Sequence, residues 1–104
     1  MSNNKKINGD DLKVLHLVHN NPKISQRGIA DQMGFSLGKV NYCIKALTEV
    51  GLIKCKVFLN HKNKSGYLYL LTPKGVSEKT VLTKRFLQNK QLEYEKLYNY
   101  FNEW

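Results

Sequence analysis

ISQRGIADQMGFSLGKVNYCIKALTEVGLI, residues 24–53, contains two short helical patterns separated by a turn at Gly34. Two helices joined by a short turn of this kind form a helix-turn-helix motif. In the second helix, apolar residues recur at helical spacing on one side. The opposite side carries small, basic and hydrogen-bonding residues, so the pattern predicts one face on a core and one face left for a partner. The predicted inward residues are Leu37, Val40, Ile44 and Leu47.

The starts of these helices can be located from side chains whose oxygen atoms accept backbone N–H groups. Ser25 and Ser36 are the predicted caps of the two helices in the motif. A further helix is expected upstream, capped by Asp10 or Asp11 and running to about His19. The chain therefore has three helices before its first strand.

Two strands are expected after the motif, over residues 52–59 and 67–71, on either side of a polar and basic turn. A hairpin directly after a helix-turn-helix is a wing, here expected at about residues 59–66. A solvated loop without a binding role is the alternative. The wing residues expected to reach a partner are His61, Lys62 and Lys64.

A last helix is predicted from Thr72, as cap, and Pro73, at the first helical position, to the C-terminus. A helix of about 30 residues is about 45 Å long, which exceeds what the rest of the chain can cover. Its apolar and aromatic residues form a stripe, and an exposed stripe usually marks an interface. We therefore expect a homodimer through this helix, with folding back on its own domain as the alternative. The expected dimerisation residues are Leu82, Phe86, Tyr94, Leu97, Tyr98, Phe101 and Trp104.

The charge of the chain favours a nucleic-acid partner. Its 104 residues carry a net charge of +9, and residues 1–74 hold 12 Lys and Arg against 4 Asp and Glu. Residues 75–104 hold 5 against 4. The excess therefore lies on the segment with the helix-turn-helix, as neutralisation of phosphates requires.

Other function classes have little support in the sequence. There is no long apolar run and no signal peptide, so no membrane partner is expected. Two cysteines, Cys43 and Cys55, are too few for a disulfide scaffold and favour the cytoplasm. With His61 they match no common metal-ligand spacing. We expect no metal, no cofactor, no identifiable small-molecule ligand and no enzymatic activity, because no catalytic constellation is present.

The predicted fold class is mainly α with a small β-hairpin, a winged helix-turn-helix plus a long C-terminal helix. The expected organisation is a flexible arm over residues 1–8, a winged helix-turn-helix DNA-binding domain over 9–74 and a dimerisation helix over 75–104.

These segments resemble a winged helix of the MarR type, and most closely the small MarR-like regulators associated with bacterial exopolysaccharide clusters. The resemblance rests on NPKISQRGIADQMG, SLGKVNYCIKAL, EVGLIK, YLYLLTPKG and SEKTVLTKRFLQNKQLEYEKL, which span about residues 12–97. It implies a dimeric DNA-binding transcriptional regulator without catalytic activity. The chain departs from the family at Gly28, where Glu is usual, and in being shorter than typical members.

By position in this family, the recognition helix, about residues 36–50, would enter the major groove and the wing would lie on the adjacent minor groove or backbone. Backbone contacts are expected from Ser25, Gln26, Arg27 and Lys45. Asn41 is also placed where it could stabilise the helix from a partly buried position. The residues expected to contact base edges are Ser36, Lys39, Asn41 and Tyr42.

Three alternatives remain open at this point. The chain could be a DNA-binding replication or partition factor without promoter regulation, or a winged-helix protein-interaction module. Cys43, at the border of core and groove face, could act as a thiol switch, although an inert cysteine is the more usual role of such a residue.

Overall fold

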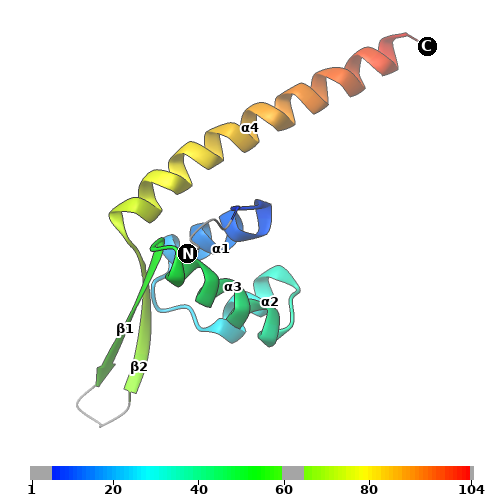
Figure 1. The fold of residues 1–104 in the computed structure, drawn as a ribbon. Helices are drawn as coiled ribbons and strands as arrows, with labels where there is room; N and C mark the ends of the chain where they lie inside the picture. The colour runs from blue at the N-terminus through cyan, green and yellow to red at the C-terminus, as the bar shows by residue number, and fades with distance from the viewer. Residues whose placement is uncertain (1–5, 60–64, 104) are drawn as a thin grey trace.

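The computed structural model describes residues 6–59 and 65–103 and has a winged-helix architecture (Figure 1). Three short helices pack together, a two-stranded hairpin projects from one end, and a long helix leads away from the hairpin to the C-terminus. The described part measures 65 × 31 × 21 Å along its principal axes, because the last helix extends past the other elements. The elements in order are α1 (Gly9–Asn20), α2 (Gln26–Met33), α3 (Leu37–Glu49), β1 (Ile53–Leu59), β2 (Ser65–Leu71) and α4 (Pro73–Asn102).

The predicted caps are confirmed at α2, α3 and α4. Ser25, Ser36 and Thr72 each accept a hydrogen bond from the backbone N–H three residues later. Gly34 has a φ of 70° at the end of α2, a left-handed conformation that favours glycine. The motif is therefore bounded by the local chemistry that the sequence predicts.

The predicted cap of α1 is wrong, because Asn8 fills that position. The Asn8 side chain accepts from the Asp11 N–H at 2.8 Å, and the Asp11 carboxylate accepts from the Asn8 N–H at 3.1 Å. This reciprocal capping box satisfies two backbone donors that the helix itself leaves unpaired. Asp10 and Asp11 instead lie in the first turn, where carboxylates interact favourably with the helix dipole.

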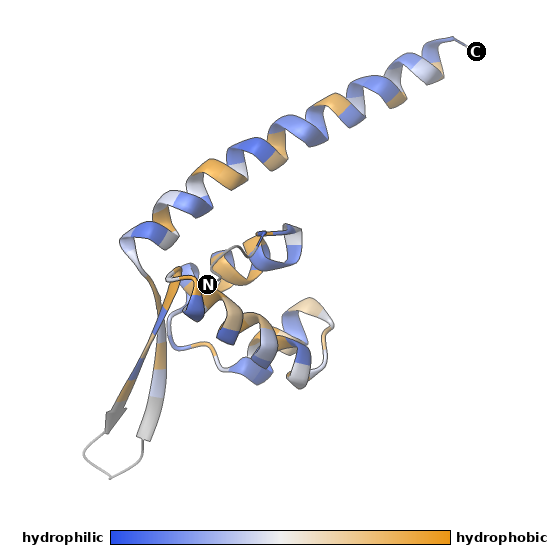
Figure 2. Cartoon of the chain, in the orientation of Figure 1, coloured by the Kyte–Doolittle hydropathy of each residue, from blue (hydrophilic) through white to orange (hydrophobic). Residues whose placement is uncertain are grey.

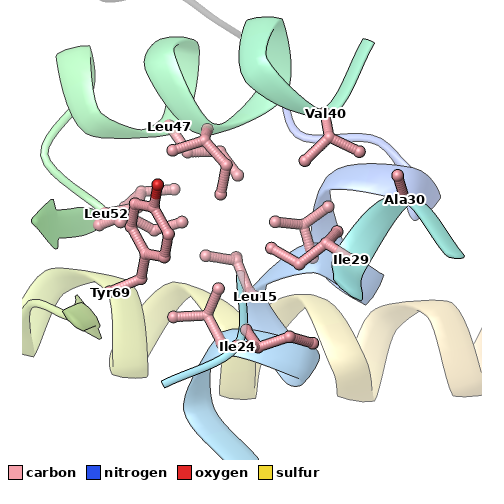
Figure 3. Packing of buried hydrophobic residues seen from close by; sticks show 12 residues of the cluster. Leu15, Ile24, Ile29, Ala30, Val40, Leu47, Leu52 and Tyr69 are labelled. Atoms are coloured by element: carbon pink, nitrogen blue, oxygen red, sulfur yellow. The ribbon is translucent and has the colours of Figure 1, made fainter. Parts of the chain in front are cut away.

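The core lies where α1, α2, α3 and the base of the hairpin meet (Figure 3). Figure 2 shows apolar segments, in orange, in these elements. Leu37 does not join them, contrary to the sequence prediction, and is 46% exposed. It occupies the first position of α3, one turn before Val40, and the helix reaches the core only from Val40 onward. Residues with no or almost no exposed surface in the core include Val14, Leu15, Val18, Ile29, Val40, Leu47 and Ile53.

The hairpin pairs β1 with β2 in antiparallel register from Ile53 opposite Leu71 to Leu59 opposite Ser65. Both strands agree with the predicted ones within two residues. The tip that carries the predicted wing residues His61, Lys62 and Lys64 lies outside the described residues. Only the base of the hairpin contributes to the core, so its outer part projects from the domain.

The long helix α4 has two parts with different surroundings. Its first part packs on the domain. Gly75 and Leu82 are buried, and Thr83 Oγ1 lies 3.2 Å from Nε2 of His16 in α1. Beyond about residue 86 every described residue is exposed. Figure 2 shows apolar and polar segments alternating along this outer part, which extends away from the other described elements.

Candidate nucleic-acid interface

The exposed face of α3 is the centre of the candidate site. Because α3 packs on the core through Val40, Ile44 and Leu47, its other side is turned to solvent. Tyr42 is 71% exposed, and Lys45 and Gly38 are open to solvent as well. We call this surface the α3 face and define it by Leu37, Gly38, Asn41, Tyr42 and Lys45.

Sequence reasoning missed Leu37 as a member of this face. Helical angle alone assigned it to the apolar side, about 20° from buried Ile44 and about 60° from buried Val40 at 100° per residue. Its position directly after the Ser36 cap was the only local signal, because the first residue of a helix lies at the edge of what the helix packs against.

Lys39 lies beside this face and is held by α1 and by the turn before α3. Its Nζ is 3.8 Å from Asp10 Oδ2 and 3.8 Å from the centre of the Phe35 ring. Both side chains of the ion pair are about half exposed, so the pair contributes little to stability. Its ammonium group is therefore directed toward α1, and Lys39 would have to leave these partners in order to contact a base.

Two of the predicted contact residues, Gln26 and Asn41, are joined by a hydrogen bond between their side-chain amides. Asn41 Nδ2 donates to Gln26 Oε1 at 3.3 Å, and Gln26 Nε2 donates to the hydroxyl of Tyr69 at 3.1 Å. Tyr69 belongs to β2 and is only 7% exposed. A chain of hydrogen bonds thus joins the core, the start of α2 and the centre of the α3 face.

The start of α2 lies beside the α3 face and presents polar groups. Arg27 and Ser25 are exposed there, and the Ser25 hydroxyl oxygen accepts from the Gly28 N–H at 2.9 Å. The absence of a side chain at Gly28 also has a packing reason, because a Cβ built there would lie 3.0 Å from Ile24 Cγ1. The unpaired N–H groups of this helix end and the Arg27 guanidinium can bind a phosphate group.

His16 of α1 lies against Thr83 of α4 and has a shifted pKa. Burial, followed by the positive charges of Lys79 and His19, lowers the pKa of His16 below its ordinary value. The Thr83 hydroxyl donates to the carbonyl of Lys79, so its oxygen accepts from the His16 Nε2–H. His16 therefore helps to dock α4 on α1 through this hydrogen bond.

The two cysteines are in different surroundings, and neither is in a disulfide. Cys43 is buried and Cys55 is exposed on β1. Within residues 6–59 and 65–103, no group of three or more His, Cys, Asp or Glu side chains is arranged to hold a metal ion. The helices described over the same ranges are too short or too polar to cross a bilayer.

The predicted dimerisation residues fall in three places. Leu82 is buried and Phe86 half-buried within the chain itself, where the Phe86 ring lies against Gly9 of α1. Trp104 lies outside the described residues. The others, Tyr94, Leu97, Tyr98 and Phe101, are exposed on the outer part of α4.

Comparison with known proteins agrees with this architecture. Residues 11–54 match a family model described as winged helix-turn-helix DNA-binding. No characterised protein gives a significant match by sequence alone.

Several solved structures with a similar fold are described as transcriptional regulators. They include the PcaV regulator of Streptomyces coelicolor in complex with its natural ligand (TM-score 0.69, 18% identity, 85% of this chain and 61% of that chain). A MarR/EmrR family regulator of Acinetobacter sp. ADP1 has a TM-score of 0.68 and 20% identity over 86% of this chain and 61% of that chain. Streptococcus pneumoniae FabT in complex with DNA has a TM-score of 0.62 and 18% identity over 88% of this chain and 62% of that chain. The chain thus spans about 60% of the length of these proteins.

Proposed function

We propose that this chain is a MarR-type transcriptional regulator that binds double-stranded DNA as a homodimer in the cytoplasm. The observation that carries the proposal is the α3 face, an exposed helix surface bearing an amide, a phenol and an ammonium group beside a projecting hairpin. The match of residues 11–54 to a DNA-binding family supports it, as does the DNA complex of FabT. The LTPKG step favours the small exopolysaccharide-associated regulators within this group.

In this proposal the N-terminal half of α3 enters the major groove, and the hairpin reaches the adjacent minor groove or backbone. Asn41 and Tyr42 contact base edges, with Leu37 against a thymine methyl group. Lys45, one turn beyond Asn41, binds phosphate. Ser25 and Arg27 bind the neighbouring phosphates from the start of α2.

The test is fluorescence anisotropy with the duplex upstream of the protein's own gene and a scrambled duplex, over a series of salt concentrations. A regulator of its own gene prefers the first duplex by about 10³-fold or more. Lys45→Ala is expected to weaken binding to both duplexes and to reduce the slope of log K against log[salt] by about 0.9. Lys84→Ala, which removes an exposed lysine from α4, is the matched control and should leave the slope unchanged.

Equal weak binding to both duplexes would contradict regulation of the neighbouring gene and leave a distant operator. Absence of binding at low salt would contradict the DNA-binding proposal as a whole.

The proposed dimer forms through the outer part of α4. Leu87, Tyr94 and Phe101 recur every seven residues, with Leu97 between the last two. This spacing is that of a coiled-coil seam. Phe101 is 77% and Leu97 68% exposed in the monomer, so a second copy of the chain would cover a large apolar surface.

The dimer can be tested with two leucines of the same helix. Leu97→Glu places a charge in the seam, whereas Leu92→Glu places the same charge on another exposed leucine outside it, 57% exposed against 68% for Leu97. Sedimentation velocity should give a dimer for the unmodified chain and for Leu92→Glu, and a monomer for Leu97→Glu. A monomeric unmodified chain, or a dimer that tolerates Leu97→Glu, would refute this interface.

A further inference from the structure

Asn41 lies at the centre of the α3 face, with Leu37 and Lys45 one helical turn to either side. It is exposed, yet its amide has one fixed partner, because Nδ2 donates to Gln26 Oε1. Gln26 in turn donates to the hydroxyl of Tyr69. In the proposed complex Asn41 faces the base edges, so a contact that orients its amide also affects which base it can bind.

The end of this chain of hydrogen bonds is a rigid point of the fold. The Tyr69 ring lies among the core residues, and Figure 3 shows it beside Leu52. The backbone N–H of Tyr69 also donates to the carbonyl of Pro22 at 3.0 Å, which holds β2 against the start of the motif. The core therefore fixes the position of the Tyr69 hydroxyl. Gln26, half-buried at the start of α2, is oriented by that hydroxyl and in turn orients the amide of Asn41.

The hydrogen bonds leave Asn41 with a specific set of free groups. A carboxamide has two N–H donors and two acceptor positions on its oxygen. One N–H is used by Gln26, so one N–H and the oxygen Oδ1 remain. If both amides were turned over, Asn41 would still keep a donor and an acceptor for a partner, so this set does not depend on the assigned orientation.

The bases in the major groove differ in how they match one donor beside one acceptor. Adenine offers the N7 acceptor and the N6–H donor side by side, and a carboxamide pairs with both. Guanine offers two acceptors, O6 and N7, so Oδ1 would face another acceptor. Thymine and cytosine each allow only one of the two hydrogen bonds. The free groups of Asn41 therefore fit adenine.

We propose that Tyr69 and Gln26 hold the Asn41 amide in the orientation that selects an adenine in each half-site. Asn41 is the specificity-determining residue, and Gln26 and Tyr69 are positioning residues that act through it. The side-chain amide of Gln26 hydrogen-bonds to Asn41 instead of making the phosphate contact that the sequence predicted for Gln26. This inference rests on the proposed function, since it specifies how that site distinguishes bases.

The experiment is selection from a pool of duplexes with a randomised centre of about 24 base pairs, enough for two half-sites about one helical turn apart. The full-length chain is bound to the pool, and the recovered duplexes are sequenced. We expect one position in each half-site at which A·T is favoured over the other pairs by about 5- to 150-fold. Asn41→Ala should abolish the preference at that position and leave the other positions unchanged.

Gln26→Leu tests the positioning role, because it removes both hydrogen bonds while keeping a side chain of similar size. It should reduce the preference at the same position nearly as far as Asn41→Ala does. Tyr69→Phe deletes one hydroxyl and keeps the buried ring, so it should reduce the preference by a smaller factor without unfolding the domain. Gln32→Leu makes the matching change at an exposed glutamine about 120° around α2 from Gln26 and should have no effect on any position.

A readout without DNA accompanies the selection. In NMR spectra of the full chain, the side-chain amide of Asn41 should be more mobile in Gln26→Leu than in the unmodified protein. A purely structural role for Gln26 would lower stability but would not change the preference at one position alone.

The outcomes separate the inference from the function beneath it. If Gln26→Leu keeps the A·T preference that Asn41→Ala removes, the positioning role is refuted. If the pool is enriched but no position depends on Asn41, its role as a specificity residue is refuted while DNA binding stands. If no sequence is enriched, the proposed function itself is refuted.

Discussion

Gly75→Ala is expected to destabilise the protein, whereas the same change at Gly38 is expected to stabilise it. Gly75 is buried in the first turn of α4, against the backbone that joins α3 to β1. A Cβ built on Gly75 overlaps the carbonyl oxygen of Leu52 and lies 3.0 Å from its carbonyl carbon. A backbone carbonyl cannot rotate away as a flexible side chain can, so α4 or the β1 connection must shift.

The cost can be worked out from this contact. Overpacking of this kind costs about 1–3 kcal/mol. The shift also weakens the hydrogen bond from the Thr72 N–H to the Leu52 carbonyl, now 3.1 Å long, which is worth about 1 kcal/mol. Alanine is favoured over glycine in a helix by about 1 kcal/mol, which offsets that loss. The net destabilisation is about 1–3 kcal/mol, a fall in melting temperature of about 5–20 °C for a domain of this size.

Gly38 provides the matched control. It is also helical, but a Cβ built there meets nothing within 4 Å. Gly38→Ala should therefore raise stability by about 0.5–1 kcal/mol. Melting is followed by circular dichroism at one fixed protein concentration, because association changes apparent stability. A Gly75→Ala protein that melts at or above the temperature of the unmodified chain would refute the close approach of α4 to Leu52.

Three further predictions concern other parts of the molecule. Burial lowers the folded-state pKa of His16 below its unfolded value of about 6.5, so the unfolded state binds a proton more readily. Stability should therefore fall as pH decreases below about 6.5. Over this pH range the melting temperature of His16→Gln should fall less than that of the unmodified chain. Asp10→Asn frees Lys39 from its ion pair and removes a negative charge beside the α3 face. DNA affinity measured by anisotropy should therefore rise by about 2- to 5-fold. A decrease in affinity would mean that the ion pair orders α3 for binding. In the folded protein a thiol reagent should modify exposed Cys55 quickly and buried Cys43 only on unfolding. Treatment with peroxide should leave DNA affinity unchanged. If peroxide abolished DNA binding by a Cys55→Ser protein, that result would instead support a thiol switch at Cys43.

Much of the architecture was determined by the sequence alone, because the decisive interactions are local. The caps Ser25, Ser36 and Thr72 each bond to a backbone N–H three residues away, and Gly34 sets the turn through its own backbone conformation. Hydrophobic periodicity identified the helices and the hairpin for the same reason. The one local error, at Asn8, arose because several residues near the start of α1 can act as a cap, and only the reciprocal bond with Asp11 distinguishes them.

The arrangement of the candidate site was decided only by the tertiary structure. Lys39 lies against Asp10, and Gln26 against Tyr69, 43 positions apart, because α1 and β2 both pack on the motif. Helical angle could not show that Leu37 is exposed, since exposure depends on where the neighbouring helix ends. Leu82 likewise carries the pattern of an interface residue, yet it is buried by its own domain. Local bonds determine which elements form, whereas side chains distant in sequence acquire their partners only when those elements pack.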